Sequence, residues 1–244
     1  MNIDNEGRRI KKTTTYSGLR KIIGNQMKAS LEKAPQAMIS TSMDMTNLAA
    51  VKARLLENGH KVTYTDLLAR VVGIALQRCP EVNAAVVDGK LHQYESVNIG
   101  IAVGTQQGLY VPVIREVQDK PLMAISAEIK EIAKNLKAGK IDSSWFTGGT
   151  FTISSLGMFD IETCTPIINP PEAAILCVGA TKKKPVVLGN DEIAVRPMAA
   201  FSLTLDHAAM DGVPGAVFLK TIGEILADAN LCLDQDGNYL GNME

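Results

Sequence analysis

F-S-L-T-L-D-H-A-A-M-D-G-V-P-G, residues 201–215, predicts a strand that ends in a turn just before a helix. Phe201, Leu203 and Leu205 share one face of this strand, because side chains alternate between the two faces of a sheet. His207 continues the same spacing. We therefore expect its imidazole to point into the protein rather than toward water.

His207 is a candidate general base. Burial at the end of a strand keeps an imidazole neutral near pH 7, which is the form that a base requires. Asp211 follows four residues later, within reach of the first turn of the next helix. The residues alone leave a second interpretation open, in which His207 is a structural histidine that satisfies nearby carbonyl groups.

Composition limits the possible partners. The chain has 244 residues, 46% hydrophobic and 21% charged, which suits one globular α/β-sized domain. Its formal net charge of -1 argues against nucleic acid or an anionic membrane as the main partner, because both usually require an excess of basic residues. No apolar run approaches the ~20 residues of a membrane helix, and residues 1–12 lack the apolar core of a signal peptide. We expect a cytoplasmic protein with no membrane partner.

The four cysteines are scattered, without a C-x-x-C pair. This spacing indicates neither a zinc site nor a disulfide framework, so we predict no metal site. We expect buried, reduced thiols at Cys79, Cys164, Cys177 and Cys232.

Apolar periodicity predicts the helices, and β-rich runs predict the strands. The expected helices cover 17–33, 46–58 with Thr46 as its cap, 63 or 65 to 77, 122–137 and 213–229. The expected strands are 37–45, covered on both faces, two runs within 97–114, and 149–155, 173–179, 184–188 and 198–205. Together they predict one α+β domain over residues 16–233, between a flexible polar arm (1–15) and a polar tail (234–244).

Six ordered blocks resemble the catalytic domain of the dihydrolipoamide acyltransferases, the core components of 2-oxo acid dehydrogenase complexes. D-H-A-A-M-D-G at 206–212 is similar to the family signature D-H-R-x-x-D-G. The other blocks are S-G-L-R-K-I-I-G (17–24), V-N-I-G-I-A-V (97–103), G-L-Y-V-P-V-I (108–114), G-G-T-F-T-I-S-S-L-G-M-F (148–159) and I-I-N-P-P-E-A-A-I-L-C-V-G (167–179).

The resemblance implies a mixed β-sheet flanked by helices, the fold of chloramphenicol acetyltransferases, and a trimer with active sites between subunits. It also implies a reaction in which an acyl group moves between a dihydrolipoyl thiol and coenzyme A. By this resemblance His207 is the base that takes the thiol proton, and Ser154 stabilises the oxyanion of the tetrahedral intermediate.

The resemblance gives Asp211 a structural role as the partner of Arg20, and an electrostatic role beside the base is the alternative. It places the contacts to coenzyme A, by block alignment, at Lys52, Thr63, Ser154, Ser155, Gly179 and Thr181.

The sequence departs from the family pattern at two charged positions. Ala208 stands where the signature has arginine, and Gly104 stands where aspartate is usual. Neither a lipoyl domain, a peripheral-subunit-binding domain nor an Ala/Pro-rich linker is recognisable. The chain is then either a core cut from a longer protein or a stand-alone acyltransferase. The implied partners are a lipoyl domain and the 2-oxo acid dehydrogenase and dihydrolipoamide dehydrogenase components.

Three functions compete on this basis. The first is acyl transfer between dihydrolipoyl groups and coenzyme A. The second is acetyl transfer from acetyl-coenzyme A to a small-molecule hydroxyl or amine. The third is a non-catalytic scaffold, and the presence of both His207 and Ser154 argues against it. The N-P-P-E-A-A-I-L block favours the first function over the second.

Overall fold

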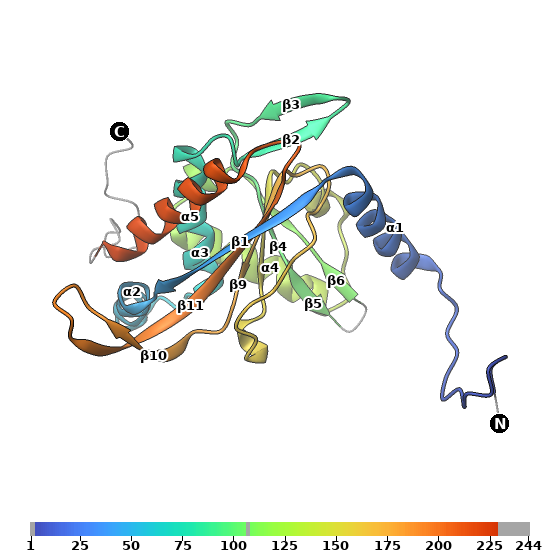
Figure 1. The fold of residues 1–244 in the computed structure, drawn as a ribbon, viewed down its shortest axis with the longest axis horizontal. Coiled ribbons are helices and arrows are strands. Elements are labelled where there is room, and N and C mark those ends of the chain that lie inside the picture. The colour runs from blue at the N-terminus through green and yellow to red at the C-terminus, as the bar shows by residue number, and fades with distance from the viewer. Residues whose placement is uncertain (1–2, 106–107, 229–244) are drawn as a thin grey trace.

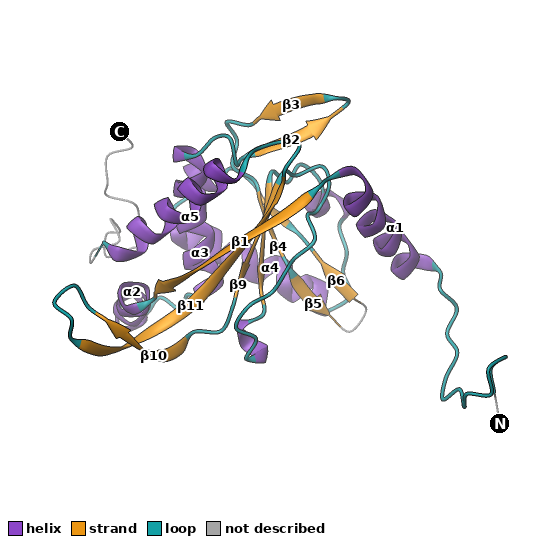
Figure 2. Ribbon diagram, viewed as in Figure 1, coloured by secondary structure: helices purple, strands orange, loops and turns teal. Residues whose placement is uncertain are grey.

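The computed structural model describes residues 3–105 and 108–228, which form a mixed sheet with helices packed against it (Figures 1 and 2). In this described part, the α-helices are α1 (Gly18–Lys33), α2 (Thr46–Glu57), α3 (Tyr64–Arg78), α4 (Leu122–Lys137) and α5 (Gly212–Ala227). Short 3-10 helices are η1 (Val117–Asp119), η2 (Ser143–Phe146) and η3 (Gly157–Phe159). The strands are β1 (Gln36–Asp44), β2 (Ala84–Val87), β3 (Lys90–Gln93), β4 (Ile99–Ile101), β5 (Val103–Thr105), β6 (Gly108–Tyr110), β7 (Val113–Ile114), β8 (Phe151–Ser155), β9 (Ala174–Val178), β10 (Lys182–Val187) and β11 (Ile193–Asp206).

The predicted helices are confirmed, with small shifts at their ends. Thr46 is not the cap of α2 but its first residue, because its hydroxyl and backbone N–H both donate to Asp44 Oδ1 before the helix begins. The two runs expected within 97–114 form the four short strands β4 to β7. Gln106 and Gln107, between β5 and β6, lie outside the described residues.

Sequence reasoning misses the hairpin formed by β2 and β3. Its turn contains Asp88 and Gly89, with φ of 50° and 71°. A two-residue hairpin turn with positive φ at both positions favours the Asp-Gly dipeptide. This dipeptide is the signal from which the hairpin could have been found.

The main sheet has the strand order β1-β11-β9-β8-β4-β7, and β10 pairs with the first part of β11. The strands β9, β8 and β4 are parallel neighbours, whereas β1, β11 and β7 pair antiparallel with theirs. The prediction of a mixed sheet is therefore confirmed. The 14-residue strand β11 runs from the β10 hairpin to Asp206 and spans the sheet from end to end.

One face of the sheet is covered by α5, next to α3 (Figure 1). Phe151 of β8 meets Phe218 of α5 with ring centroids 5.4 Å apart, and both side chains are fully buried. Gly215 allows the close approach of α5, because an added Cβ would lie 2.8 Å from Leu205 Cδ2. Aromatic burial of this kind dominates core energetics. This helix-covered face holds the apolar core.

The opposite face carries small polar side chains in a cross-strand row. Ser40 pairs with Ser202, Ser202 with Cys177, and Cys177 with Ser154, across β1, β11, β9 and β8. Residues paired in register point to the same face of a sheet. The hydroxyls of Ser40 and Ser202 lie 3.1 Å apart and share a hydrogen bond. We call Ser40, Ser202, Cys177 and Ser154 the cross-strand row.

Strand β1 lies at the edge of the sheet, and the residues on one of its faces, Met38, Ser40, Ser42 and Asp44, are exposed. The expectation that it is covered on both faces is therefore wrong for this chain. Met43 is its buried residue, whereas Met38 is 44% exposed. One face of β1 packs on α5, and its opposite face has no helix over it in the described residues. The mixed polar and apolar sequence of β1 fits this arrangement.

Cys164 and Cys177 form a disulfide with their Cα atoms 6.2 Å apart. The expectation of reduced thiols is wrong for these two residues. Spacing in the sequence could not reveal the pair, because β9 brings Cys177 alongside a segment that has no regular structure of its own. Cys79 is a buried free thiol, as expected, and Cys232 lies outside the described residues.

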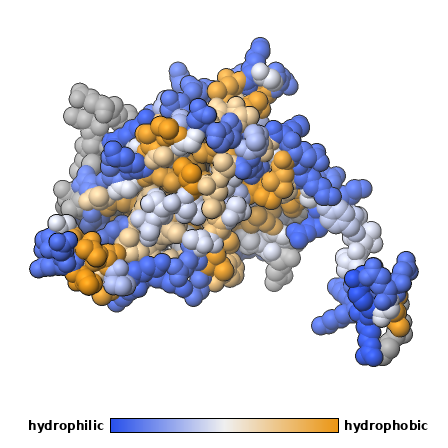
Figure 3. Space-filling view, viewed as in Figure 1, coloured by the Kyte–Doolittle hydropathy of each residue, from blue (hydrophilic) through white to orange (hydrophobic). Residues whose placement is uncertain are grey.

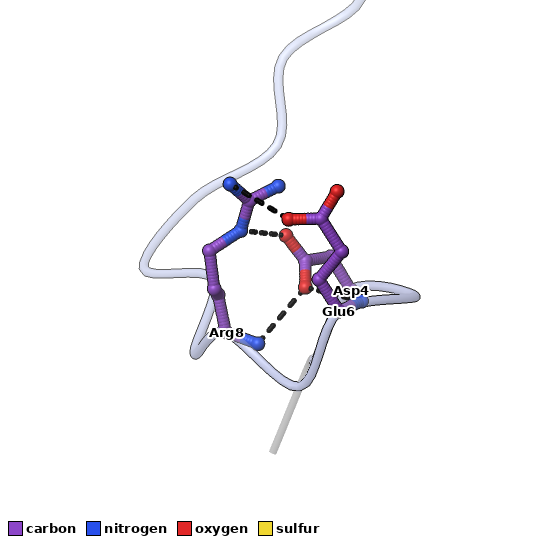
Figure 4. A network of polar contacts seen from close by, with 3 residues as sticks. All are labelled: Asp4, Glu6 and Arg8. Atoms are coloured by element: carbon purple, nitrogen blue, oxygen red, sulfur yellow. Dashed lines mark hydrogen bonds and ion pairs between the residues drawn. The ribbon is translucent and has the colours of Figure 1, made fainter.

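The residues before α1 extend away from the sheet (Figure 1). Here Arg8 Nε donates to Asp4 Oδ2 at 2.6 Å, and Arg8 Nη1 lies 3.1 Å from Glu6 Oε2 (Figure 4). Exposed ion pairs of this kind contribute ~1 kcal/mol or less. The division into an arm, a domain at 16–233 and a tail stays a prediction, and residues 234–244 lie outside the described residues.

Exposed apolar side chains gather on the β10–β11 hairpin. Val187, Ile193 and Val195 are all more than half exposed, and an orange patch lies over this hairpin in Figure 3. Among the described helices, none combines the length and the apolar character that crossing a bilayer takes.

Candidate active site

His207 follows the last residue of β11, at the end of the sheet where α1 joins β1. Its backbone N–H donates to Pro35 O at 3.0 Å, which fixes the main chain there. Its side chain is 50% exposed, so the expectation of a buried imidazole is wrong for the chain by itself. The strand ends at Asp206, and the alternation of faces that predicted burial ends with it.

Asp211 lies at the N-terminus of α5, with its side chain 89% exposed. Its Oδ1 atom is 3.9 Å from His207 Nδ1. Arg20 lies near the start of α1, and within the described residues no contact joins it to Asp211. The structure therefore brings Asp211 next to the histidine, not next to the arginine that the resemblance implied.

Ser154 lies in β8, half-buried, on the face opposite the helices. Its neighbour in register on β9 is Cys177, one partner of the disulfide. Gly179 follows β9 and donates its N–H to Ala200 O at 3.0 Å. A Cβ atom on Gly179 would collide with Glu162 O, so only glycine fits there. The Ser154 end of the sheet is thus closely packed around the ends of β8 and β9.

Ser154, Ser155, Gly179 and Thr181 lie together at the ends of these two strands. Lys52 and Thr63 form a second group on α2 and α3, in which Lys52 Nζ lies 5.1 Å from the centre of the Tyr64 ring.

Thr63 is the N-cap of α3. Its Oγ1 accepts from Asp66 N, and Asp66 Oδ2 accepts from Thr63 N, which together form a capping box. The C-terminal end of α3 lies toward His207. Ala84, shortly after that helix, accepts at its backbone oxygen from Ala173 N, and Ala173 O accepts from Asp206 N, next to His207. Thr63 therefore lies toward the Ser154 end of the sheet.

His207 and Ser154 do not meet inside one chain. Leu205, two residues before His207, pairs with Ala174, whereas Ser154 pairs with Cys177, further along β9. At ~3.3 Å per residue and ~4.8 Å per strand, the register separates the two residues by ~17 Å along the strands and ~10 Å across them. The two candidate catalytic side chains thus belong to opposite ends of the sheet.

Glu172 is a functional candidate that sequence reasoning misses. It is 4% exposed, and burial raises the pKa of its carboxyl to about 8. Thr152 Oγ1 donates to Glu172 Oε2 at 2.6 Å, and Asn169 Nδ2 donates to Oε1 at 3.1 Å. Its neighbour Ala173 O accepts from Asp206 N, so this carboxyl lies at the His207 end. The available signal was a single charged residue inside the apolar run I-I-N-P-P-E-A-A-I-L.

The chain matches known proteins over most of its length. The family model described as 2-oxoacid dehydrogenases acyltransferase (catalytic domain) matches residues 8–233. The dihydrolipoyllysine-residue acetyltransferase component of the acetoin cleaving system of Bacillus subtilis is 37% identical over 217 residues, which cover 87% of this chain and 54% of that protein. The chain spans about half the length of the curated relatives it matches.

Solved structures agree with the family. The dihydrolipoamide acetyltransferase of Azotobacter vinelandii is 33% identical, with a TM-score of 0.86 and coverage of 94% of this chain and 96% of that one. A structure described as the cubic core of the pyruvate dehydrogenase multienzyme complex gives the same identity, TM-score and coverage. A chloramphenicol acetyltransferase, 14% identical over 83% of this chain and 94% of that one, has a TM-score of 0.54 and supports the fold alone. The chain belongs to the 2-oxoacid dehydrogenase acyltransferase (catalytic domain) family.

Proposed function

We propose that this chain transfers an acyl group between a dihydrolipoyl thiol and coenzyme A. The observation that carries the proposal is His207, held by its main chain at the end of β11 with Asp211 beside its imidazole. A serine, a histidine and an asparagine are described in the catalytic mechanism of the Azotobacter enzyme. That histidine and asparagine are four residues apart, as are His207 and Asp211.

His207 acts as the base in this proposal. A thiol with a pKa of ~8.5 is mostly protonated near pH 7, so a base must take its proton as the sulfur attacks the thioester carbonyl. The half-exposed imidazole leaves a ring nitrogen open to a substrate. Asp211 Oδ1, 3.9 Å from His207 Nδ1, lies close enough to orient the imidazole ring.

Ser154 stabilises the oxyanion in this proposal. Attack on the carbonyl places negative charge on its oxygen, and a hydroxyl donor aimed at that position lowers the barrier. Ser154 lies on an internal strand of the sheet, between β9 and β4, which fixes its backbone. No serine or cysteine nucleophile is needed, because the incoming thiol attacks directly.

The separation of His207 and Ser154 supports a trimer with shared sites. Each residue lies at its own end of the sheet, with its chemical partner missing from that end. A second copy that presents its Ser154 end to the His207 end of the first would complete a site, and a closed ring of three copies would complete three. The relative described as a cubic core also assembles further.

The residues proposed to contact coenzyme A fall into two groups, according to whether their polar atoms already form hydrogen bonds within the chain. Thr63 Oγ1 serves the capping box, and Gly179 N–H serves Ala200 O. We infer that Gly179 permits a close approach of backbone and that Thr63 holds the helix end. The side-chain hydroxyls of Ser155 and Thr181, in contrast, have no hydrogen-bond partner within the described residues, so they can donate to a ligand.

Lys52 supplies the positive charge in this proposal, since coenzyme A carries phosphates. Its ammonium group now lies over the Tyr64 ring and stays exposed enough to reach a ligand. The lipoyl domain, the 2-oxo acid dehydrogenase and the dihydrolipoamide dehydrogenase components are the partners proposed with this activity. The cytoplasmic location remains a prediction from the sequence.

Subunit complementation tests the shared site. The variants His207→Ala and Ser154→Ala are co-expressed with different affinity tags, and the mixed assembly is purified through both tags. Acyl transfer from acetyl-, succinyl-, propionyl- and branched acyl-coenzyme A to free dihydrolipoamide is then measured. We expect each variant to be inactive by itself and part of the activity to return in the mixture, with a trimer mass or a multiple of it by light scattering.

Two outcomes would contradict the proposal. An active monomer would rule out the shared site, as would a mixed assembly with no recovered activity. Acetyl transfer to small amines or hydroxyls but not to dihydrolipoamide would favour the second function that the sequence allows.

A further inference from the structure

The disulfide between Cys164 and Cys177 lies directly beside Ser154. Cys177 is the register partner of Ser154, and both belong to the cross-strand row. Neighbouring strands lie ~4.8 Å apart and paired residues point to the same face, so the disulfide lines the space into which Ser154 points. Nothing in the proposed acyl transfer uses these two sulfurs.

The disulfide ties a long irregular segment to the sheet. Residues 160–172 connect η3 to β9 without a helix or strand. At one end of the segment, Ile161 O accepts from Ala180 N at 2.7 Å. Toward the other end, Ser30 of α1 donates its hydroxyl to Ile168 O at 2.7 Å. Cys164 lies between these two hydrogen bonds, and its bond to Cys177 is a covalent link from the segment to the sheet.

The remaining polar contacts near Cys164 are exposed. Glu162 contacts Lys182 at 3.2 Å and Lys184 at 2.5 Å, and all three side chains are at least one-third exposed. Exposed ion pairs of this kind contribute ~1 kcal/mol or less. The far end of the segment has further ties, since Glu172 is buried and accepts from Thr152 and Asn169, and Ile168 N donates to Gln36 Oε1. Around Cys164, in contrast, the disulfide is the tie that contributes most to the position of the segment next to Ser154.

The two cysteine residues differ in exposure. Cys177 is 1% exposed, whereas Cys164 is partly exposed in the irregular segment. An external thiolate attacks an accessible sulfur along the disulfide axis. Cys164 Sγ is thus the point of attack, and Cys177 Sγ is the leaving group.

We propose that Cys164–Cys177 is a reversible thiol–disulfide site, reduced by small dithiols of the dihydrolipoyl class, that controls the segment 160–172 beside Ser154. Its redox chemistry is independent of the proposed acyl transfer, and its effect on turnover rests on that function. A dithiol whose two sulfurs are separated by three carbons is the substrate class, because its second thiol closes a five-membered cyclic disulfide in an intramolecular step.

The exchange balances in two steps. The first thiolate of the dithiol attacks Cys164 Sγ, the S–S bond breaks, and Cys177 Sγ leaves with the electron pair and takes up a proton. The second thiolate of the same molecule attacks its own mixed-disulfide sulfur and closes the ring. Cys164 Sγ then leaves and takes up a proton. Two electrons and two protons pass from the dithiol to the protein. A monothiol is slower because its second step is bimolecular.

The oxidised and reduced forms of the cysteine pair should hold the segment 160–172 differently. In the oxidised state Cys164 is held to β9, and Ser154 keeps a fixed neighbour. In the reduced state the part of the segment around Cys164 depends on its backbone anchors and its exposed ion pairs. Small displacements beside a catalytic group lower turnover, so we expect the reduced protein to have a kcat about fivefold lower.

The experiment treats the full chain with dihydrolipoamide, or with an equal thiol concentration of glutathione, and maps Cys164 and Cys177 by alkylation and peptide mass spectrometry. Hydrogen exchange of peptides that cover 160–178 is followed in both states. We expect dihydrolipoamide to reduce the pair faster than glutathione, and exchange in 160–172 to rise on reduction. Cys164→Ser should show the raised exchange without any reductant, and Cys79→Ala, the matched control, should behave as the wild type.

Three results would overturn the proposal. Alkylation of neither Cys164 nor Cys177 after dithiol treatment would show that the pair is inert. Equal rates for the dithiol and glutathione would remove the substrate class. Unchanged hydrogen exchange in the reduced protein and in Cys164→Ser would remove the control of the segment. None of these readouts uses acyl transfer, so a protein without that activity would refute the proposed function and leave this test intact.

Discussion

The His207 end and the Ser154 end of the sheet differ in what holds their functional side chains. At the His207 end, the backbone is fixed by Pro35 O while the imidazole is half-exposed beside an exposed carboxylate. At the Ser154 end, neighbouring strands, a disulfide and a glycine that tolerates no Cβ enclose the serine. The His207 end presents a reactive side chain to solvent, and the Ser154 end holds its side chain in rigid surroundings. This difference is what two complementary halves of a site would require.

Removing the imidazole is the strongest way to break this comparison. His207→Ala should lower the acyl-transfer rate by roughly 10²–10⁴, the usual loss when a general base is removed. Steady-state kinetics measure the loss. His92→Ala, which removes another exposed histidine, in β3, is the matched control and should keep wild-type rates and stability. Retention of more than about a tenth of the activity by His207→Ala would refute the assignment.

A substitution at the Ser154 end should have the next largest effect on the rate of acyl transfer. Ser154→Ala should lower kcat by roughly 10²–10³ with little change in affinity for coenzyme A, because the oxyanion exists only along the reaction path. Ser202→Ala, from the same cross-strand row, is the control and should change kcat little. If Ser154→Ala weakened ground-state binding and left kcat unaltered, Ser154 would instead be a contact to coenzyme A.

The pH dependence of stability tests the His207 end of the sheet, because the buried carboxyl of Glu172 lies there. Its pKa is raised from 4.5 to about 8, so between these values the folded protein binds one more proton than the unfolded chain. The free energy of unfolding should therefore fall as pH rises through this window, at a slope of up to ~1.4 kcal/mol per pH unit. Glu172→Gln has no such proton, and its slope should be flatter.

Urea unfolding of wild type and Glu172→Gln from about pH 5 to about pH 8 measures both slopes. The amide keeps an acceptor for the Thr152 hydroxyl, so the variant should still fold. Parallel stability curves for the two proteins would show that Glu172 does not hold a proton in the folded state.

The smallest expected effect concerns the helix that flanks the Ser154 end. Thr63→Ala removes the side-chain acceptor of the capping box and should lower the free energy of unfolding by ~1 kcal/mol, as the loss of an N-cap usually does. Thr63→Ser keeps the hydroxyl oxygen and should restore most of the difference. Thermal or urea unfolding compares the three proteins, and equal stability of Thr63→Ala and wild type would argue against the cap.

The local elements could be predicted from the sequence, whereas the contacts between distant segments could not. Periodicity placed the helix at 122–137, and the sequence narrowed the cap of the helix before it to Thr63 or Thr65, of which the structure shows Thr63. The disulfide and the raised pKa of Glu172 depend on which segments lie against β9 and β8, and spacing carries no such information. The exposure of His207 depends on where β11 ends, which is a matter of one or two residues.

Strand β1 has consequences for how the chain folds as it is synthesised. Its partner in the sheet is β11, with Gln36 opposite Asp206 and Asp44 opposite Met198. A chain emerging from the ribosome therefore carries β1 without its partner until β11, the last strand of the described residues, has been made. Such long-range pairing is slow to form and leaves strand edges open to other chains in the meantime. A fragment that ends before residue 198 should be far more prone to aggregate than the whole chain, because its β1 edge can never be paired.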